Sequence, residues 1–318
     1  MKNQPREVPV FLFNGLLESG KTVMVNRFFE NRQICGGRKI VLIVCEEGIE
    51  EYDEKNLREK NVTLVSVEDE EDFNSALYED IERKYAPDIV AIEYNGMWDG
   101  NAPLEIVYPD GWQLVEIMTT VDSTTFDAYS KNLRAMLVEQ FRNSDIVIFN
   151  RFTDDSKKMA YRSLVKAVNM RVQVVYEYED GTMDAQFDAS PFDLTKDEID
   201  VSDADFGVFY FDVMDNVDKY EGKTVTMRAQ AAQISAVAAN GFLIGRFAMT
   251  CCANDIQFIS IYVKNNMTFK NKAWYYVKAK VVSVDASIYG EEPGGKLAAL
   301  EVLSLAPATA PEEEVVTF

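Results

Sequence analysis

The sequence predicts a two-domain protein, in which an α/β domain with a mostly parallel sheet is followed by a small all-β domain. A chain of 318 residues is long for one hydrophobic core and sufficient for two. In the first half, continuous runs rich in Val and Ile alternate with helical patterns, which is typical of a parallel sheet covered on both faces. From about residue 206 the apolar segments become short and alternating. We therefore expect the α/β domain over 1–178, an acidic linker over 179–205, a barrel over 206–308 and a surface tail over 309–318.

The strands and helices expected in the α/β domain differ in their apolar period. The strands are continuous apolar runs, at Val8–Asn14, Lys39–Cys45, Val62–Val67, Asp88–Glu93, Leu114–Val121, Asp145–Asn150 and Val172–Tyr178. The helices carry apolar residues at steps of three and four, at Thr22–Asn31, Asp72–Tyr85, Thr124–Arg142 and Asp155–Asn169.

The second half contains about six short segments with strand character. They are Val208–Val213, Thr224–Ile234, Gly241–Phe247, Gln257–Val263, Trp274–Asp285 and Leu297–Leu305. Glycine turns separate several of them, as at Asn240-Gly241. Six strands in about 100 residues predict a small antiparallel barrel, most similar to an OB-fold.

Composition excludes several function classes. With 32 Lys and Arg against 53 Asp and Glu, the formal net charge is −21, which repels nucleic acid and anionic membranes. The chain has no histidine, which excludes Ser-His-Asp triads and every metal site that needs a histidine ligand. The N-terminal residues carry no apolar leader, and no apolar run is long enough to span a membrane. We therefore expect a cytoplasmic protein with no nucleic-acid partner and no direct membrane insertion.

Residues Gly15–Thr22, G-L-L-E-S-G-K-T, match the G-x-x-x-x-G-K-[ST] pattern of a phosphate-binding loop (P-loop). A strand precedes the loop and a helix follows it, so backbone N–H groups and the helix dipole would face a phosphate. Lys21 would neutralise β- and γ-phosphate oxygens, and the Thr22 hydroxyl would bind Mg²⁺. The expected nucleotide-binding residues of the loop are Gly15, Glu18, Ser19, Gly20, Lys21 and Thr22. An ordinary glycine-rich turn is the alternative, and the strand–loop–helix context argues against it.

A P-loop NTPase also needs a carboxylate on the sheet side to hold the metal. Glu93 ends one apolar strand and Asp122 ends another, so we expect either carboxylate beside the loop as an Mg²⁺ ligand. Gly96, three residues after Glu93, would let a backbone N–H approach the γ-phosphate. For Glu93, the alternative is a solvent-exposed side chain at a strand end.

Asn150 and Arg151 begin the stretch N-R-F-T-D, which follows another apolar strand. Guanine-specific enzymes use N-K-x-D at this point, where the acid binds the base and the Lys stem packs over the ring. Here Arg replaces Lys, and Arg also stacks on a purine. Because the acid falls one place late, the choice between guanine and adenine stays open. A turn or helix-capping role is the alternative for Asn150.

Taken together, these stretches resemble the CobW-type GTPases, relatives of the UreG and HypB nickel-insertion proteins. The resemblance covers about residues 8–178. It rests on the order of V-P-V-F-L-F-N-G-L-L-E-S-G-K-T, V-C-E-E-G-I-E-E-Y-D, D-I-V-A-I-E-Y-N-G-M, T-T-V-D-S-T-T-F and S-D-I-V-I-F-N-R. It implies GTP or GDP as ligand, Mg²⁺ as cofactor, slow hydrolysis and a switch function in metal homeostasis.

The same resemblance implies further site residues. Glu46 and Glu47 fall where the family places acids that respond to nucleotide and metal. They join Lys21 and Glu93 as candidate catalytic residues, and a solvent-facing loop is the alternative for each. The cysteine metal motif C-x-C-C of the family is missing, since residues 62–73 contain no cysteine.

The second half resembles the C-terminal domain of a bacterial family encoded with membrane permeases, some members of which are associated with zinc homeostasis. The stretch G-R-F-A-M-T-C-C-A-N-D carries this resemblance. It implies a permease-like partner and makes Cys251, Cys252 and Asp255 candidate Zn²⁺ ligands. Core packing of one cysteine is the alternative for that site. For the whole protein, the alternative to a GTPase is a non-hydrolysing, nucleotide-binding regulatory subunit or adaptor of a permease.

Overall fold

The computed structural model describes residues 6–46, 48, 52–185, 190–233, 241–250, 255–264 and 267–317. The chain forms two compact units. The first comprises Met1–Asp155 and Arg171–Phe187, and the second comprises Ser156–Met170 and Asp188–Phe318.

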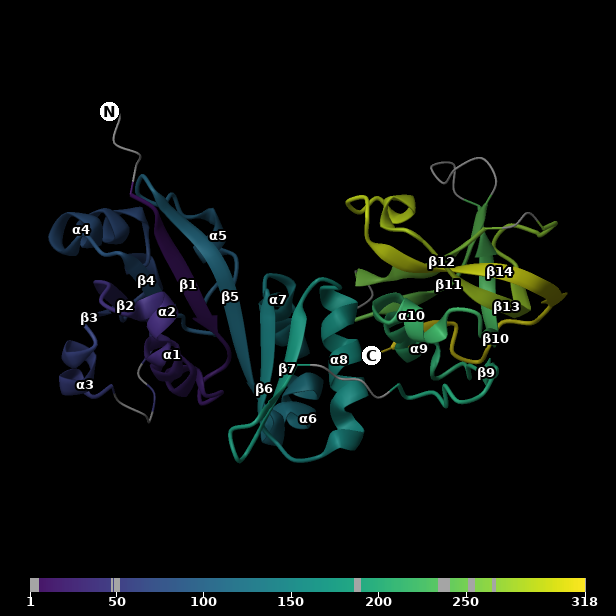
Figure 1. The fold of residues 1–318 in the computed structure, drawn as a ribbon, viewed down its shortest axis with the longest axis horizontal. Coiled ribbons are helices and arrows are strands. Elements are labelled where there is room, and N and C mark those ends of the chain that lie inside the picture. The colour runs from purple at the N-terminus through teal and green to yellow at the C-terminus, as the bar shows by residue number, and fades with distance from the viewer. Residues whose placement is uncertain are drawn as a thin grey trace. The chain divides into compact units, whose positions relative to one another are not determined.

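The first unit is built on one sheet. Its strands are β1 (Val8–Asn14), β2 (Ile40–Val44), β3 (Val62–Ser66), β4 (Ile89–Glu93), β5 (Trp112–Asp122), β6 (Ile146–Phe152), β7 (Gln173–Tyr178) and β8 (Met183–Asp184). They lie in the order β3-β2-β4-β1-β5-β6-β7-β8, and every pair is parallel except β7 with β8. Figure 1 shows this order from β3 to β7. The central position of β1, between β4 and β5, places the ends of several strands around the loop that follows β1.

Helices cover both faces of this sheet. They are α1 (Lys21–Glu30), α2 (Arg32–Cys35), α3 (Glu54–Glu59), α4 (Ser75–Tyr85), α5 (Ala102–Glu105), α6 (Ser123–Asn132) and α7 (Arg134–Arg142). Side chains alternate across β1: Val10 and Leu12 share a core with Ile81 of α4, whereas Phe13 shares one with Val25 of α1. The predicted mostly parallel sheet with two covered faces is confirmed.

The second unit contains a closed barrel. Its strands are β9 (Glu198–Asp200), β10 (Thr224–Ala232), β11 (Phe242–Met249), β12 (Gln257–Val263), β13 (Trp274–Asp285), β14 (Lys296–Pro307) and β15 (Val315–Thr317), and its helices are α8 (Lys158–Val168), α9 (Phe206–Asp215) and α10 (Val217–Tyr220). Strand β10 pairs with β11 and β13, β11 with β12, β12 with β14, and β14 with β13, which closes a ring of five (Figure 1). Of these pairs only β12 with β14 is parallel. The predicted small all-β domain is confirmed.

The structure differs from the sequence prediction at three places in the chain. The predicted strand Val208–Val213 lies in α9, where Phe206 and Phe209 are buried in the barrel core. An apolar run of this length does not by itself distinguish a buried strand from a buried helix. The expected tail at 309–318 contains β15, which pairs with β11 and buries Val316.

The third difference concerns segments at the junction of the expected domains. Helix α8, expected in the α/β domain, groups with the second unit, where Arg162 forms an ion pair with Asp215 of α9. The expected linker at 179–205 contains β8, which pairs with β7, and β9, which pairs with β10.

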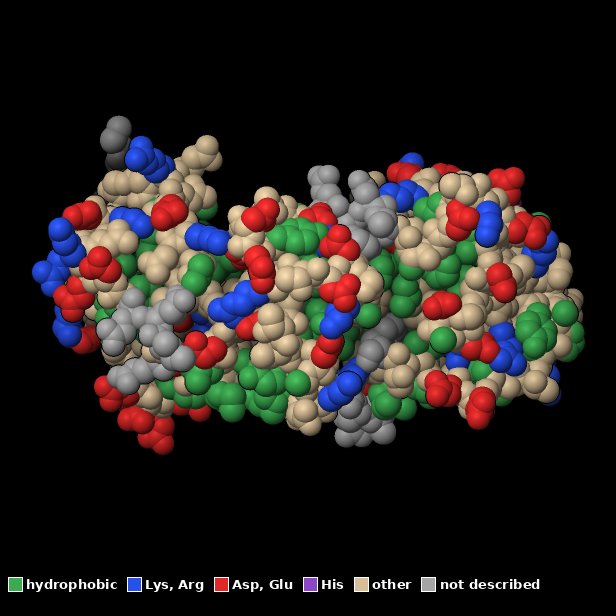
Figure 2. Space-filling model, turned by 90° about the horizontal axis from the view of Figure 1, so that it is seen from below, with side chains coloured by type: hydrophobic (Ala, Val, Ile, Leu, Met, Phe, Trp, Pro, Cys, Tyr) green, Lys and Arg blue, Asp and Glu red, His purple; other side chains and the backbone are tan. Residues whose placement is uncertain are grey.

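Within the described ranges, no helix has both the length and the apolar character that crossing a membrane requires. Figure 2 shows acidic and basic side chains interspersed over one face of the molecule. On that face the net negative charge is therefore not gathered into a single patch.

Candidate nucleotide-binding site

Two glycines give the loop between β1 and α1 its shape. Gly15 has φ 139° and Gly20 has φ 96°, both in the region that favours glycine. A Cβ atom on Gly15 would lie 2.5 Å from the carbonyl oxygen of Thr120, and one on Gly20 would lie 2.5 Å from Nδ2 of Asn150. Backbone strain and lack of space therefore both require glycine at these two motif positions.

Side chains of β1, β5 and β6 hold the loop through hydrogen bonds. The Gly15 N–H donates to Oδ1 of Asn14 (2.8 Å), and the hydroxyls of Ser19 and Thr120 lie 2.8 Å apart and share a hydrogen bond. From β6, Nδ2 of Asn150 donates to the carbonyl oxygen of Ser19 (2.6 Å). The structure thus brings the predicted base-recognition residue Asn150 to the P-loop, where it fixes the loop backbone.

The Lys21 ammonium lies inside the loop. Its Nζ donates to the carbonyl oxygens of Gly15 (2.8 Å) and Leu16 (3.0 Å) and forms an ion pair with Oε1 of Glu46. The side chains of Lys21 and Glu46 are only 2% and 7% exposed. This is therefore a buried charge pair, in which the loss of either partner would leave an uncompensated charge.

Thr22, at the start of α1, contacts the carboxylate that ends β4. Its hydroxyl donates to Oε1 of Glu93 (2.8 Å), and the Tyr52 hydroxyl donates to Oε2 of the same carboxylate. The pKa of Glu93 is raised above its usual value because the carboxyl is buried. The two hydrogen bonds and the charge of Lys21 oppose this shift without cancelling it. Burial, together with the negative charge of Glu93, raises the pKa of Tyr52. The predicted Thr22–Glu93 pair is assembled, and Tyr52 joins it.

Sequence reasoning missed Tyr52. Tyr52 lies in the stretch V-C-E-E-G-I-E-E-Y-D, but only the glutamates of that stretch were assigned a role, and the contact of Tyr52 with Glu93 spans 41 positions of the chain. The only available signal was its position six residues after Glu46 in a stretch already singled out.

Asp122 and Arg151 form a separate pair beside the loop. Arg151 forms an ion pair with Asp122, and its Nη1 donates to the Glu18 carbonyl oxygen (3.2 Å). The Asp122 carboxylate also caps α6 by accepting the Thr124 N–H (2.8 Å). The structure therefore brings Asp122 to Arg151 rather than to Thr22 and Glu93.

Gly96 packs directly against the P-loop. A Cβ at this position would lie 2.1 Å from the Gly15 carbonyl oxygen, and the Gly96 carbonyl accepts a hydrogen bond from Nε2 of Gln140 (3.0 Å). The loop after β4 thus approaches the P-loop backbone more closely than any residue with a side chain allows.

The candidate zinc residues are only partly described. Cys251 and Cys252 lie outside the described residues, as does Glu47. Oδ1 of Asp255 accepts the Thr250 N–H (3.1 Å). In the described part of the chain, no three Cys, Asp or Glu side chains form a group that could hold a metal ion.

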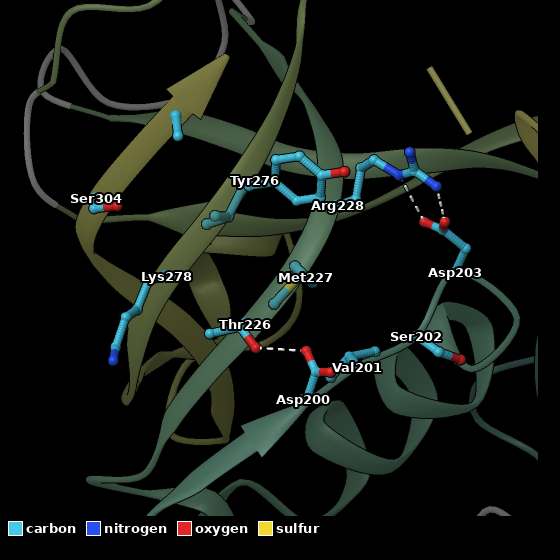
Figure 3. A pocket seen from close by; sticks show the side chains of 12 residues that line it. Asp200, Val201, Ser202, Asp203, Thr226, Met227, Arg228, Tyr276, Lys278 and Ser304 are labelled. Carbon is cyan, nitrogen blue, oxygen red and sulfur yellow. Dashed lines mark hydrogen bonds and ion pairs between the residues drawn. The ribbon is translucent and has the colours of Figure 1, made fainter. Parts of the chain in front are cut away.

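A second hollow lies on the barrel, between β10, β13, β14 and the segment after β9 (Figure 3). Its cations are already neutralised: Arg228 pairs with Asp203 through two hydrogen bonds, and Nζ of Lys278 donates to Glu198 (2.6 Å). Because these charges are satisfied within the barrel, we place the functional site at the P-loop.

Comparison with known families agrees with this geometry. Residues 9–176 match the family model of the CobW/HypB/UreG nucleotide-binding domain. The chain belongs to the CobW/HypB/UreG family. Residues 9–176 therefore form the GTPase-like nucleotide-binding domain of that family, and residues 178–316 match the model of the DUF1980 C-terminal domain.

No curated protein sequence matches this chain. Among solved structures, the hydrogenase maturation factor HypB from Archaeoglobus fulgidus is 18% identical, with a TM-score of 0.40 over 55% of this chain and 82% of that chain. The Zn(II)-bound YjiA GTPase from E. coli is 14% identical, with a TM-score of 0.43 over 93% and 95%. A Zn(II)-bound triple mutant of YjiA is 15% identical, with a TM-score of 0.44 over the same shares. We take the family from the sequence match alone.

Gly96 provides a direct test of the packing between the β4 loop and the P-loop. Gly96→Ala is expected to lower the free energy of unfolding by at least about 2 kcal/mol, because the new Cβ must displace backbone at Gly15. Gly100→Ala is the matched control, since its nearest atom is the side-chain Cγ of Glu139 at 3.2 Å. Urea denaturation of the two variants measures the difference, and equal stabilities would contradict the close contact.

Proposed function

We propose that this protein binds GTP together with Mg²⁺ and hydrolyses it slowly, as a cytoplasmic switch in metal homeostasis. One observation carries the proposal: the Thr22 hydroxyl at the start of α1 lies 2.8 Å from Oε1 of the buried Glu93, beside the Lys21 ammonium. A hydroxyl and a carboxylate at this position provide the hard oxygen ligands that Mg²⁺ prefers.

In this proposal each residue of the site has a separate role. The backbone of Gly15 and of Glu18 to Thr22 encloses the phosphates, and Lys21 neutralises their β and γ oxygens. Thr22 and Glu93 would hold Mg²⁺, which would supply positive charge to the phosphates. Glu46 and Glu47 orient water or hold the metal through water, as the family resemblance implies.

The base site is proposed at Arg151. Its side chain is 44% exposed, and its guanidinium is held beside the loop by the Glu18 carbonyl oxygen and by Asp122. A planar cation in that position can stack on a purine. We favour guanine because of the family to which the chain belongs. In this assignment Asp122 orients Arg151, and Glu93 is the Mg²⁺ carboxylate.

We further propose that residues 1–178 carry the nucleotide and that the barrel, which we regard as OB-like because of its five-strand ring, contacts a permease-like membrane partner. The resemblance of the second half to a permease-associated family supports this part. The second candidate function is a regulatory subunit that binds nucleotide without hydrolysing it. The ion pair of Lys21 with Glu46 favours that alternative, because it occupies the group that would stabilise the γ-phosphate.

Phosphate release separates the two candidates. With GTP and Mg²⁺ in excess, the wild-type protein is expected to release phosphate over multiple turnovers, slowly because P-loop switches commonly need a partner to complete the site. Lys21→Ala should abolish the release, since it removes the cation that neutralises the phosphates. Release no faster than this variant's background would contradict hydrolysis and leave the regulatory subunit.

Zinc binding tests the proposed metal function of the second half. If Cys251 and Cys252 supply thiolate ligands, the double variant Cys251→Ser/Cys252→Ser should lose Zn²⁺ affinity by at least about tenfold. Equilibrium dialysis under reducing conditions measures this. Cys35→Ser/Cys45→Ser, at the two buried free cysteines of the first unit, is the control. Undiminished binding in the first variant would exclude Cys251 and Cys252 as ligands.

A further inference from the structure

Two side chains occupy the polar groups that the proposed function assigns to ligands. Glu46 pairs with the Lys21 ammonium, and Tyr52, six residues later, donates to the Glu93 carboxylate. Lys21 is the proposed phosphate contact and Glu93 the proposed metal contact. The proposed phosphate contact and the proposed metal contact are therefore each engaged by a side chain of the protein itself.

The contact of Glu46 with Lys21 is one that a phosphate would replace. A carboxylate oxygen and a phosphate oxygen are both anionic acceptors, and Nζ of Lys21 already donates to two backbone carbonyls besides Glu46. The other carboxylate oxygen of Glu46, Oε2, is buried and has no hydrogen-bond partner among the described groups. A half-satisfied buried carboxylate costs free energy, so an anion with more acceptor oxygens can displace it.

The contact of Tyr52 with Glu93 occupies a carboxylate oxygen that Mg²⁺ would otherwise bind. Oε1 of Glu93 accepts from Thr22 and Oε2 accepts from Tyr52, so both oxygens of the carboxylate are engaged by hydroxyl donors. A hydroxyl hydrogen and Mg²⁺ compete for the same oxygen lone pairs. For Glu93 to offer Oε2 to a metal or to its water, the Tyr52 hydroxyl must leave.

We propose that Glu46 and Tyr52 are internal competitors of the nucleotide phosphate and of its Mg²⁺, and that they set the affinity of the site. The inference rests on the proposed function. Because the binding-competent arrangement is then only a fraction of the population, the apparent dissociation constant rises by the inverse of that fraction. The same competition re-forms the Lys21–Glu46 and Tyr52–Glu93 contacts after hydrolysis, which favours release of the nucleoside diphosphate.

Binding titrations of the full chain with fluorescent GDP and a fluorescent non-hydrolysable GTP analogue test this. Glu46→Gln is expected to bind both about tenfold more tightly in the presence of Mg²⁺, because it removes the competing charge. Tyr52→Phe is expected to lower the Mg²⁺ concentration for half-maximal binding about threefold to tenfold. In EDTA the affinity of Tyr52→Phe should stay close to that of the wild type, because its effect acts through the metal.

The matched controls are Glu71→Gln and Tyr85→Phe, which make the same chemical changes at exposed positions of the first unit. Both should bind as the wild type does. Lys21→Ala, which removes the phosphate contact, gives the baseline.

The outcomes separate the inference from the proposed function. If Glu46→Gln and Tyr52→Phe bind no more tightly than the wild type, while Lys21→Ala does not bind, the competition is overturned and nucleotide binding is retained. Tighter binding by Glu46→Gln supports the competition, including the case in which the wild type binds too weakly to detect. Failure of the wild type and both variants to bind would overturn the inference and the proposed function together.

Discussion

The loop between β1 and α1 folds around one ammonium group, that of Lys21. Its position is fixed by the carbonyl oxygens of Gly15 and Leu16, which can turn inward because Gly15 and Gly20 adopt positive φ. Asn150 holds the loop from one side, and the backbone at Gly96 approaches from another. Strand β6 and the loop after β4 therefore pack against the backbone that holds this cation, and the carboxylate of Glu46 pairs with it.

The strand order explains why these groups meet. Parallel strands end at one edge of a sheet, and β1 lies between β4 and β5, with β2 and β6 next in line. The residues that end or follow these strands therefore gather around one loop. Glu93 registers beside Phe13 of β1, and Asp122 beside Asn150 of β6. The −21 charge of the chain does not prevent anion binding here, because the contacts are local cations and backbone dipoles.

Much of this site could be predicted from sequence, because its residues lie in short motifs after apolar strands. The loop and the pairing of Thr22 with Glu93 belong to that part. The hydrogen bond from Asn150 to the Ser19 carbonyl does not, because the sequence suggested a base-binding or capping role for Asn150. Tyr52 could not be predicted, since its bond to Glu93 depends on tertiary folding and leaves no periodic signal. The same limit applies to α9, whose mostly apolar residues fit a buried strand equally well, and to β15, a strand of three residues. The ion pair of Asp122 with Arg151 depends likewise on the side chains of adjacent strands.

The central claim is that the Lys21 loop binds a nucleoside phosphate, and ligand-induced thermal stabilisation tests it most directly. At a ligand concentration about 100 times the dissociation constant, GTP or GDP with Mg²⁺ should stabilise the wild type by about 2.7 kcal/mol, a rise in melting temperature of about 5 °C or more. The rise should be absent in Lys21→Ala. A melting temperature that no concentration of GTP, GDP or ATP changes, or one that rises equally in Lys21→Ala, would contradict the account.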